Sequence, residues 1–231
     1  MVARSLLHSL AVMVMIYGYQ RLQALPIDAV VKNQYGGHFQ YLTIQGVFLA
    51  CATTLISLIL DIFPSTTGRL LSASTSPSNP LPVLKPLKRI MLLVSLPLTV
   101  VISSVYWPLL LLATHLILPT EEGSPSSQAP QLMRIPLSTD LALHAMPAIS
   151  MLGDFLLFEK RCSLKELRYG APSLSFIYTI FYTWWVERCA SFNGKFPYPF
   201  LETTLEIRIS IYCGAGLLAL LSFPLINKLH S

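Results

Sequence analysis

The amino-acid sequence predicts an all-α, polytopic membrane protein with six transmembrane helices, and two properties of the chain support this prediction. Of the 231 residues, 53% are hydrophobic and only 12% are Asp, Glu, Lys or Arg, against about 25% charged residues in a soluble domain. Six apolar stretches each hold roughly 18 residues or more, which is the length needed to cross a hydrocarbon core about 30 Å thick. Most of the surface must therefore face lipid, and we expect one membrane domain over residues 1–231.

The six predicted spans follow one another along the chain. Pro64 closes the second span and Pro119 closes the third. Pro97 and Pro108 lie inside the third span, where a proline removes a helix hydrogen bond, so a kink is expected there. The predicted spans are Ser5–Leu25, Tyr41–Phe63, Ile90–Leu118, Leu137–Phe158, Ser173–Ala190 and Ile207–Ile226.

Two connectors differ in composition from the spans. Residues 65–86 are rich in Ser, Thr and Pro, and residues 120–136 contain Glu121-Glu122-Gly123 followed by a Ser/Pro-rich run. Neither can bury an apolar face, so both are predicted to be mobile. Arg4 precedes the first span, but the apolar run continues without a small-residue cleavage site, which favours a retained first helix over a signal peptide.

Lys and Arg residues are divided unevenly between the two sides of the predicted membrane. Ten fall at the N-terminus, the second and fourth loops and the C-terminus, and six fall on the opposite side. The positive-inside rule then places both termini in the cytosol, and we expect the endoplasmic reticulum or the plasma membrane as the location. The formal charge of +5 follows from this topology. Nucleic-acid binding is not expected, because the chain has neither a basic helix nor an aromatic-and-glycine pattern.

Thr43 and His144 are the polar residues most indicative of chemistry. Thr43 lies two residues inside the second span and His144 lies seven residues inside the fourth. Both spans begin on the same side, so the two side chains are predicted to lie in the same half of the bilayer. A threonine hydroxyl becomes a nucleophile when a base takes its proton, and a neutral imidazole is such a base. Asp140, one helical turn before His144, is placed to fix the tautomer of the ring.

Structural roles compete with each of these assignments. A threonine in a membrane helix usually bonds a carbonyl of its own backbone, and a histidine can link two helices. Asp140 and Asp154 are alternatively partners for buried Arg or Tyr side chains. Gly36-Gly37, just before the second span, indicates a tight turn or a set of backbone N–H groups that binds an oxyanion. His115 either faces the same cavity or packs elsewhere. The aromatic residues Trp184, Trp185 and Tyr198 are predicted to be interfacial anchors.

Several other chemistries do not fit the sequence. The chain has only five histidines and none forms an HxxxH pair, which argues against a membrane di-iron enzyme. It has no HExxH zinc motif, no GxSxG nucleophile elbow and no Gly-rich phosphate loop. The four cysteines form no CxxC pair, so neither a disulfide framework nor a zinc site is expected. We therefore predict a site without metal or cofactor.

Three blocks of the sequence resemble a known family. The block Gly36-Gly37-His38-Phe39-Gln40-Tyr41-Leu42-Thr43 is similar to a Gly-Gly-x-x-Lys-Tyr-Leu-Thr pattern. The block Asp140-Leu141-Ala142-Leu143-His144 is similar to Asn-His-x-x-His. The block Gly194-Lys195-Phe196-Pro197-Tyr198-Pro199-Phe200-Leu201 is similar to Gly-x-Trp-x-Tyr-Pro. In this order and spacing they resemble the androgen-induced and androgen-dependent family of six-pass membrane threonine hydrolases over essentially the whole chain.

The resemblance implies a function and also shows departures from the family pattern. It implies that Thr43 is the nucleophile and His144 its partner, in a hydrolase that cleaves fatty acid esters of hydroxy fatty acids. Gln40, Asp140, Leu141, Ala145 and Phe196 replace the Lys, Asn, His, Thr and Trp of the family. Thr43 and His144 match the family pattern while residues around them differ, so the sequence defines the reaction better than the substrate.

Two other functions are compatible with the sequence. The first is a non-catalytic multi-pass protein that binds, transports or regulates lipid. The second is a proton-coupled carrier that uses His144, Asp140 and His115. A pure binder would retain a lipid ester without cleaving it, and a carrier would show pH-dependent flux across liposomes without hydrolysis.

Overall fold

Apolar helices dominate the structure, a computed structural model that describes residues 2–63, 81–117 and 134–230. Within these ranges the chain is all-helical and has no strand. The long helices are α1 (Val2–Gln23), α3 (Leu42–Ile62), α4 (Leu81–Leu112), α6 (Met146–Phe158), α7 (Ala171–Asn193) and α8 (Leu205–Leu229). Short helices join or extend them: α2 (Pro26–Val31), η1 (Gly37–Gln40), η3 (Thr114–Leu116), α5 (Leu137–Asp140), η4 (Leu141–Ala145), η5 (Glu166–Gly170) and η6 (Pro199–Leu201).

Five of these segments are long and apolar enough to cross a membrane. They are α1, α3, residues 83–112 of α4, the continuous run α5–η4–α6 over residues 137–158, and α8. The sixth predicted span corresponds to α7, which has 23 residues and so a length of about 35 Å. Its Tyr, Trp and Thr residues make it less apolar than the other five. The prediction of an all-α membrane protein is confirmed, and six spans are roughly consistent with the structure.

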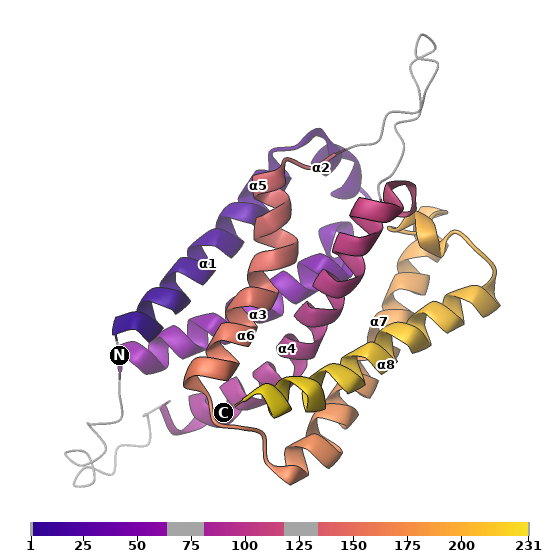
Figure 1. The fold of residues 1–231 in the computed structure, drawn as a ribbon. Coiled ribbons are helices and arrows are strands. Elements are labelled where there is room, and N and C mark those ends of the chain that lie inside the picture. The colour runs from indigo at the N-terminus through magenta and orange to yellow at the C-terminus, as the bar shows by residue number, and fades with distance from the viewer. Residues whose placement is uncertain (1, 64–80, 118–133, 231) are drawn as a thin grey trace, which may run out of the picture.

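The long helices stand side by side, and both chain ends lie at the same end of the bundle, opposite α2 (Figure 1). We call these the terminal end and the α2 end. Small residues allow the helices to approach closely, as is common in membrane proteins. A Cβ added to Gly18 of α1 would lie 2.7 Å from the Cβ of Ala142 in η4. This contact holds the turn that carries His144 against α1.

The helices pack around a core of fully buried apolar side chains. Four helices, α1, α3, α4 and α6, contribute residues with no exposed surface, among them Ala11, Met15, Ala50, Leu92, Leu96, Met151 and Phe155. Hydroxyl groups inside α3 bond the carbonyl one turn earlier: Thr53 bonds Leu49 at 2.7 Å and Thr54 bonds Ala50 at 2.8 Å. In this way the polar side chains inside the span need no water.

The start of α4 corrects one sequence boundary. Residues 81–86, predicted as the end of a mobile connector, are the first turns of α4. The sequence prediction began the span at Ile90, after the charged residues Lys88 and Arg89, whereas the helix runs through these two residues, which pair with Glu159 and Glu166. Residues 134–136 are non-helical. The remaining parts of both predicted connectors lie outside the described residues.

Other span boundaries differ less from the prediction. Helix α4 ends at Leu112 and not at Leu118, because Ala113 leaves the helical region at φ −148°, ψ 53°. The helix runs through both Pro97 and Pro108. The run from Leu137 to Phe158 has the predicted ends. Helical structure begins at residue 164, before α7 itself, and so earlier than the predicted start at Ser173.

Candidate active site

Thr43 is the second residue of α3, at the α2 end of the bundle. Threonines inside a helix bond the carbonyl four residues back, which for Thr43 belongs to Phe39. That oxygen already accepts hydrogen bonds from Gln45 Nε2 at 2.7 Å and from Trp185 Nε1 at 2.9 Å. The default threonine bond seen at Thr53 and Thr54 is therefore not made by Thr43 within the described residues. Its hydroxyl lies instead within hydrogen-bonding reach of the Tyr198 hydroxyl.

Tyr198 caps the helix that begins at Leu42. Its hydroxyl oxygen accepts the N–H of Leu42 at 2.8 Å. It also lies within hydrogen-bonding reach of the side chain and the backbone N–H of Thr43, and of the Tyr182 hydroxyl. Burial raises the pKa of the Tyr198 phenol, so the group keeps its proton at neutral pH. The sequence predicted only an interfacial anchor here.

His144 lies in the π-helical turn η4, where a helix gains one residue per turn. Such turns often occur at functional sites because they re-aim a side chain. Ser103 of α4 donates a hydrogen bond to the His144 carbonyl oxygen. The turn is therefore fixed by α4 as well as by Gly18 of α1.

Asp140 contacts His144 as the sequence spacing predicts. His144 Nδ1 lies 3.1 Å from Asp140 Oδ1 and 3.2 Å from the Asp140 backbone oxygen. Both neighbours are acceptors, so Nδ1 carries the hydrogen and Nε2 keeps its lone pair. The imidazole is thus held in the tautomer that a general base requires.

Tyr106 holds the other side of this pair. Its ring is stacked on the His144 ring, with centroids 3.4 Å apart and planes 1° from parallel. Its hydroxyl donates to Asp140 Oδ1 at 2.5 Å. The alternative prediction that Asp140 pairs with a buried Tyr is therefore also met, since one carboxylate serves both residues. Sequence analysis did not single out Tyr106, which lies within the third predicted span.

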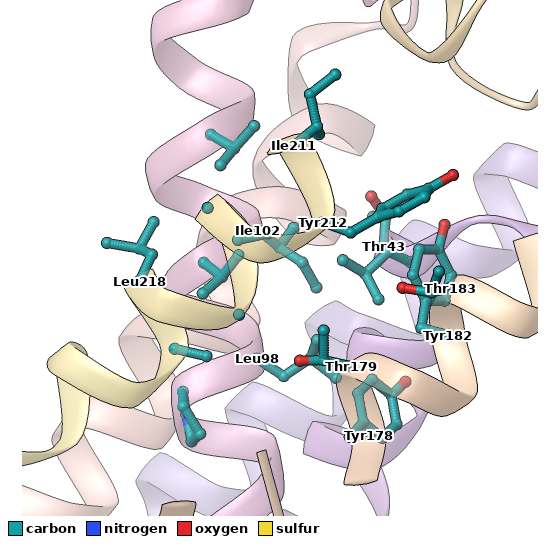
Figure 2. A pocket seen from close by; sticks show the side chains of 18 of the residues that line it. Thr43, Leu98, Ile102, Tyr178, Thr179, Tyr182, Thr183, Ile211, Tyr212 and Leu218 are labelled. Atoms are coloured by element: carbon teal, nitrogen blue, oxygen red, sulfur yellow. The ribbon is translucent and has the colours of Figure 1, made fainter. Parts of the chain in front are cut away.

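Thr43 and His144 line the same small cavity, of about 90 Å³. Residues from α1, α2, η1, α3, α4, η4 and the α7–α8 connection form its walls. A larger cavity of about 280 Å³ lies between α4, α7 and α8 and also reaches Thr43. Figure 2 shows this larger cavity, with Leu98 and Ile102 on one wall and Tyr178 and Tyr182 on another.

The two cavities meet at the nucleophile candidate. Four residues line both of them: Thr43, Tyr106, Ile117 and Tyr198. Three of the four carry hydroxyl groups, in surroundings that are otherwise almost entirely apolar. The structure therefore places Thr43 and His144 in the wall of one small cavity, and Asp140 contacts His144.

Other sequence-predicted features lie away from this junction or have another role. Gly36 and Gly37 adopt φ 84° and 48°, and Gly37 N–H bonds Gln34 O at 3.0 Å. They form a turn, and Gly36 lies so close to α7 that an added Cβ would be 2.6 Å from Cys189 Sγ. His115 is exposed in η3 and lines neither cavity.

Asp154 lies at the terminal end of the bundle, away from Thr43. It pairs with His8 at 2.9 Å and with Lys88 at 2.9 Å, and not with Arg or Tyr as the alternative reading expected. Among the described residues, no group of three His, Cys, Asp or Glu side chains is arranged to hold a metal ion.

A hydrogen bond between His38 and Asp28 borders the small cavity at the α2 end. His38, one of its lining residues, has Nε2 2.7 Å from Asp28 Oδ1 in α2. The hydrogen bond from His38 lowers the pKa of the Asp28 carboxyl, which stays ionised at neutral pH. This pair ties η1 to α2 beside the segment that leads into Thr43.

Comparison with known proteins identifies the family. The model of the FAR-17a/AIG1-like proteins matches residues 3–231. The chain belongs to this family. The androgen-induced family predicted from the three sequence blocks is thereby confirmed.

Two curated relatives are yeast membrane proteins. A UPF0641 membrane protein of Schizosaccharomyces pombe is 29% identical over 206 residues, which cover 88% of this chain and 79% of the relative. A UPF0641 membrane protein of Saccharomyces cerevisiae is 27% identical over 129 residues, which cover 54% and 51%. No solved structure matches this chain at a significant level.

Proposed function

We propose that this FAR-17a/AIG1-like protein is an intramembrane hydrolase of lipid carboxylic esters, with Thr43 as nucleophile and His144 as base. The observation that supports the proposal is the shared cavity: Thr43 and His144 line the same space, and Asp140 holds the remaining ring nitrogen of His144. Membership of the family adds to it through the match of both residues to the family blocks.

The proposed reaction has two halves. His144 Nε2 takes the hydroxyl proton of Thr43, and Oγ1 attacks the ester carbonyl carbon. The tetrahedral intermediate collapses when the bond to the alcohol oxygen breaks, and His144 returns the proton to that oxygen. Water then attacks the acyl-threonine with His144 again as base, which releases the fatty acid and restores Thr43.

The electrostatics at Thr43 favour negative charge in the transition state. Thr43 lies in the first turn of the 21-residue helix α3, and a helix N-terminus carries a partial positive charge. The Tyr198 hydroxyl accepts the Leu42 N–H and so has its own proton to donate. An oxyanion beside Thr43 would meet this donor in a site that excludes bulk water, where such hydrogen bonds are strong.

The surroundings indicate the substrate class. The larger cavity is lined almost entirely by apolar groups and lies within the membrane-spanning helices, so it suits hydrocarbon chains. Fatty acid esters of hydroxy fatty acids, the class implied by the family resemblance, are the first substrates to test. We further propose that the protein lies in the endoplasmic reticulum or plasma membrane, with both termini cytosolic.

Purified protein in nonionic detergent tests the proposal against a panel of lipid esters. Thr43→Ala and His144→Ala should each abolish hydrolysis and covalent labelling by a fluorophosphonate, while Thr53→Ala, whose hydroxyl bonds its own helix, should retain both. Labelling that persists in Thr43→Ala would remove the nucleophile assignment. Retention of an ester without turnover by the wild-type protein would instead support the non-catalytic lipid binder.

A further inference from the structure

His144 lines only one of the two cavities that meet at Thr43. His144 lines only the small cavity, whereas Thr43, Tyr106 and Tyr198 line both cavities. An ester carbonyl that Thr43 attacks must therefore sit at the junction, and its two arms extend into two different spaces. Because the base His144 lines only the small cavity, its position determines which arm of the ester enters which cavity.

Proton transfer sets the direction of the substrate. In the first half-reaction the proton removed from Thr43 must be delivered by His144 to the oxygen of the departing alcohol. That oxygen has to lie on the His144 side of the junction, because a general acid acts within hydrogen-bond distance. The opposite orientation would place the leaving oxygen on the far side of the carbonyl carbon from the imidazole.

We infer that the acyl arm of the ester occupies the larger cavity between α4, α7 and α8, and that the alcohol arm occupies the small cavity beside η4 and α2. This assignment rests on the proposed function and goes beyond it, because it names which part of the substrate each cavity recognises. The acyl chain thus stays in the larger cavity as the acyl-threonine, while the alcohol leaves past α2.

The shape of the larger cavity fits an extended acyl chain. Along α4 its lining runs from Val94 to Tyr106. The two residues are twelve positions apart, which corresponds to roughly 18 Å along the helix axis. A volume of about 280 Å³ spread over this length is narrow. Some hydroxyl groups in its wall bond protein partners: Tyr178 donates to Gln45 Oε1 at 2.7 Å and Thr179 donates to the Ser175 carbonyl at 2.8 Å. The space therefore presents mainly carbon, as a hydrocarbon chain requires.

The small cavity differs in size and polarity. At about 90 Å³ it has a third of the volume, and His38, Tyr41 and His144 contribute polar groups to its wall. Its apolar wall includes Ile27 and Val31 of α2. Such a space is suited to the part of the ester that carries the oxygen atom to be protonated.

Two substitutions change one cavity each. Gly214 of α8 is exposed at the edge of the larger cavity, and a Cβ added there meets no atom within 4 Å, so we expect Gly214→Leu to narrow that cavity without a clash at Cβ. Its control is Cys213→Leu, at an exposed neighbour outside the lining. Ile27→Ala enlarges the small cavity. Its control is Val30→Ala, at an exposed position of the same helix.

The assignment of the two arms to the two cavities is tested by measuring kcat/KM for two series of esters. One series varies acyl length at a fixed alcohol, and the other varies the alcohol at a fixed acyl chain. Gly214→Leu should lower kcat/KM for long acyl chains by about 10-fold or more relative to short ones and leave the ranking of alcohols unchanged. Ile27→Ala should shift preference about 10-fold toward bulkier alcohols and leave the acyl ranking unchanged. The reverse pattern, or equal effects on both series, overturns the assignment.

Photo-crosslinking gives a second measurement that does not depend on turnover. Thr43→Ala protein is loaded with an ester that carries a diazirine at the end of either the acyl or the alcohol arm. The acyl label should attach within residues 175–183 or 211–219 and the alcohol label within residues 22–41, and exchanged positions overturn the assignment. The proposed function itself fails in a different way, namely when the wild-type protein shows no hydrolysis that depends on Thr43.

Discussion

Nε2 of His8 lies 2.9 Å from Oδ1 of Asp154, although both side chains are almost completely shielded from solvent. The other ring nitrogen of His8 lies 2.7 Å from Asp61. Each ring nitrogen of His8 therefore faces one carboxylate, a group that accepts hydrogen bonds. The full cluster alternates three basic and three acidic side chains that join α1, α3, α4 and the end of α6: Arg4, Asp61, His8, Asp154, Lys88 and Glu159.

Because basic and acidic side chains alternate in this cluster, a single substitution that removes one charge is predicted to lower the stability of the protein strongly. Asp154→Asn leaves His8 and Lys88 without their shared carboxylate, and breaking a buried pair in this way costs about 3–5 kcal/mol. Lys32→Met is the control, since Lys32 is 58% exposed and pairs with Asp28 at 3.7 Å, a contact worth about 0–1 kcal/mol. Unfolding in mixed micelles measures both. Equal stability of the two variants would mean that the cluster is not a structural clamp.

Tyr106 is predicted to position His144 through its ring more than through its hydroxyl. Tyr106→Phe keeps the stacked ring and removes one hydrogen bond to Asp140, a change of about 1 kcal/mol or roughly 5-fold in rate. Tyr106→Leu removes the flat surface against which the imidazole lies, and loss of alignment can lower the rate by about 100-fold. Ester turnover measures both, and thermal unfolding shows whether the fold is kept. A Phe variant as inactive as the Leu variant would assign the role to the hydroxyl.

The spans and the Asp140–His144 contact were predictable because both depend on short-range patterns. Hydropathy placed α3 within one residue at each end, and the spacing of four residues put Asp140 beside His144. The start of the helical segment before α7 could also have been predicted from the sequence. Ser163 and Glu166 form reciprocal hydrogen bonds as an S-x-x-E capping box, a signal that sequence analysis passed over.

Tyr198 and His8 were not predictable because their roles depend on tertiary structure. An aromatic residue after a span has the same local pattern whether it faces lipid headgroups or folds back onto another helix. Only the path of the α7–α8 connection places the Tyr198 hydroxyl on the N-terminus of α3. In the same way, His8 finds its two carboxylates 53 and 146 residues away, beyond the reach of any periodic pattern.

Tyr198 is predicted to act as a donor to the oxyanion. Tyr198→Phe keeps the ring but removes the hydroxyl beside Leu42 and Thr43, and loss of one oxyanion donor lowers kcat by about 10²–10³. Tyr178→Phe is the matched control, because that hydroxyl also belongs to the wall of the larger cavity but donates to Gln45. The kcat of both variants decides the matter. A similar loss in the two would point to a general effect of removing a buried hydroxyl.

Glu166 gives the protein a predicted loss of stability in acid. The hydrogen bond from Arg89, helped by Ser163, lowers the pKa of the Glu166 carboxyl from 4.5 to about 2. Because the pKa is depressed in the folded state, the stabilisation is complete above about pH 4.5 and is lost as the pH falls toward 2. Glu166→Gln should therefore unfold at a lower temperature than wild type at pH 7, and the difference should shrink steadily below pH 4.5. Thermal unfolding in a nonionic detergent across this range measures it. A difference that stays constant down to pH 3 would show that the stabilisation comes from the capping geometry and not from the charge of the carboxylate.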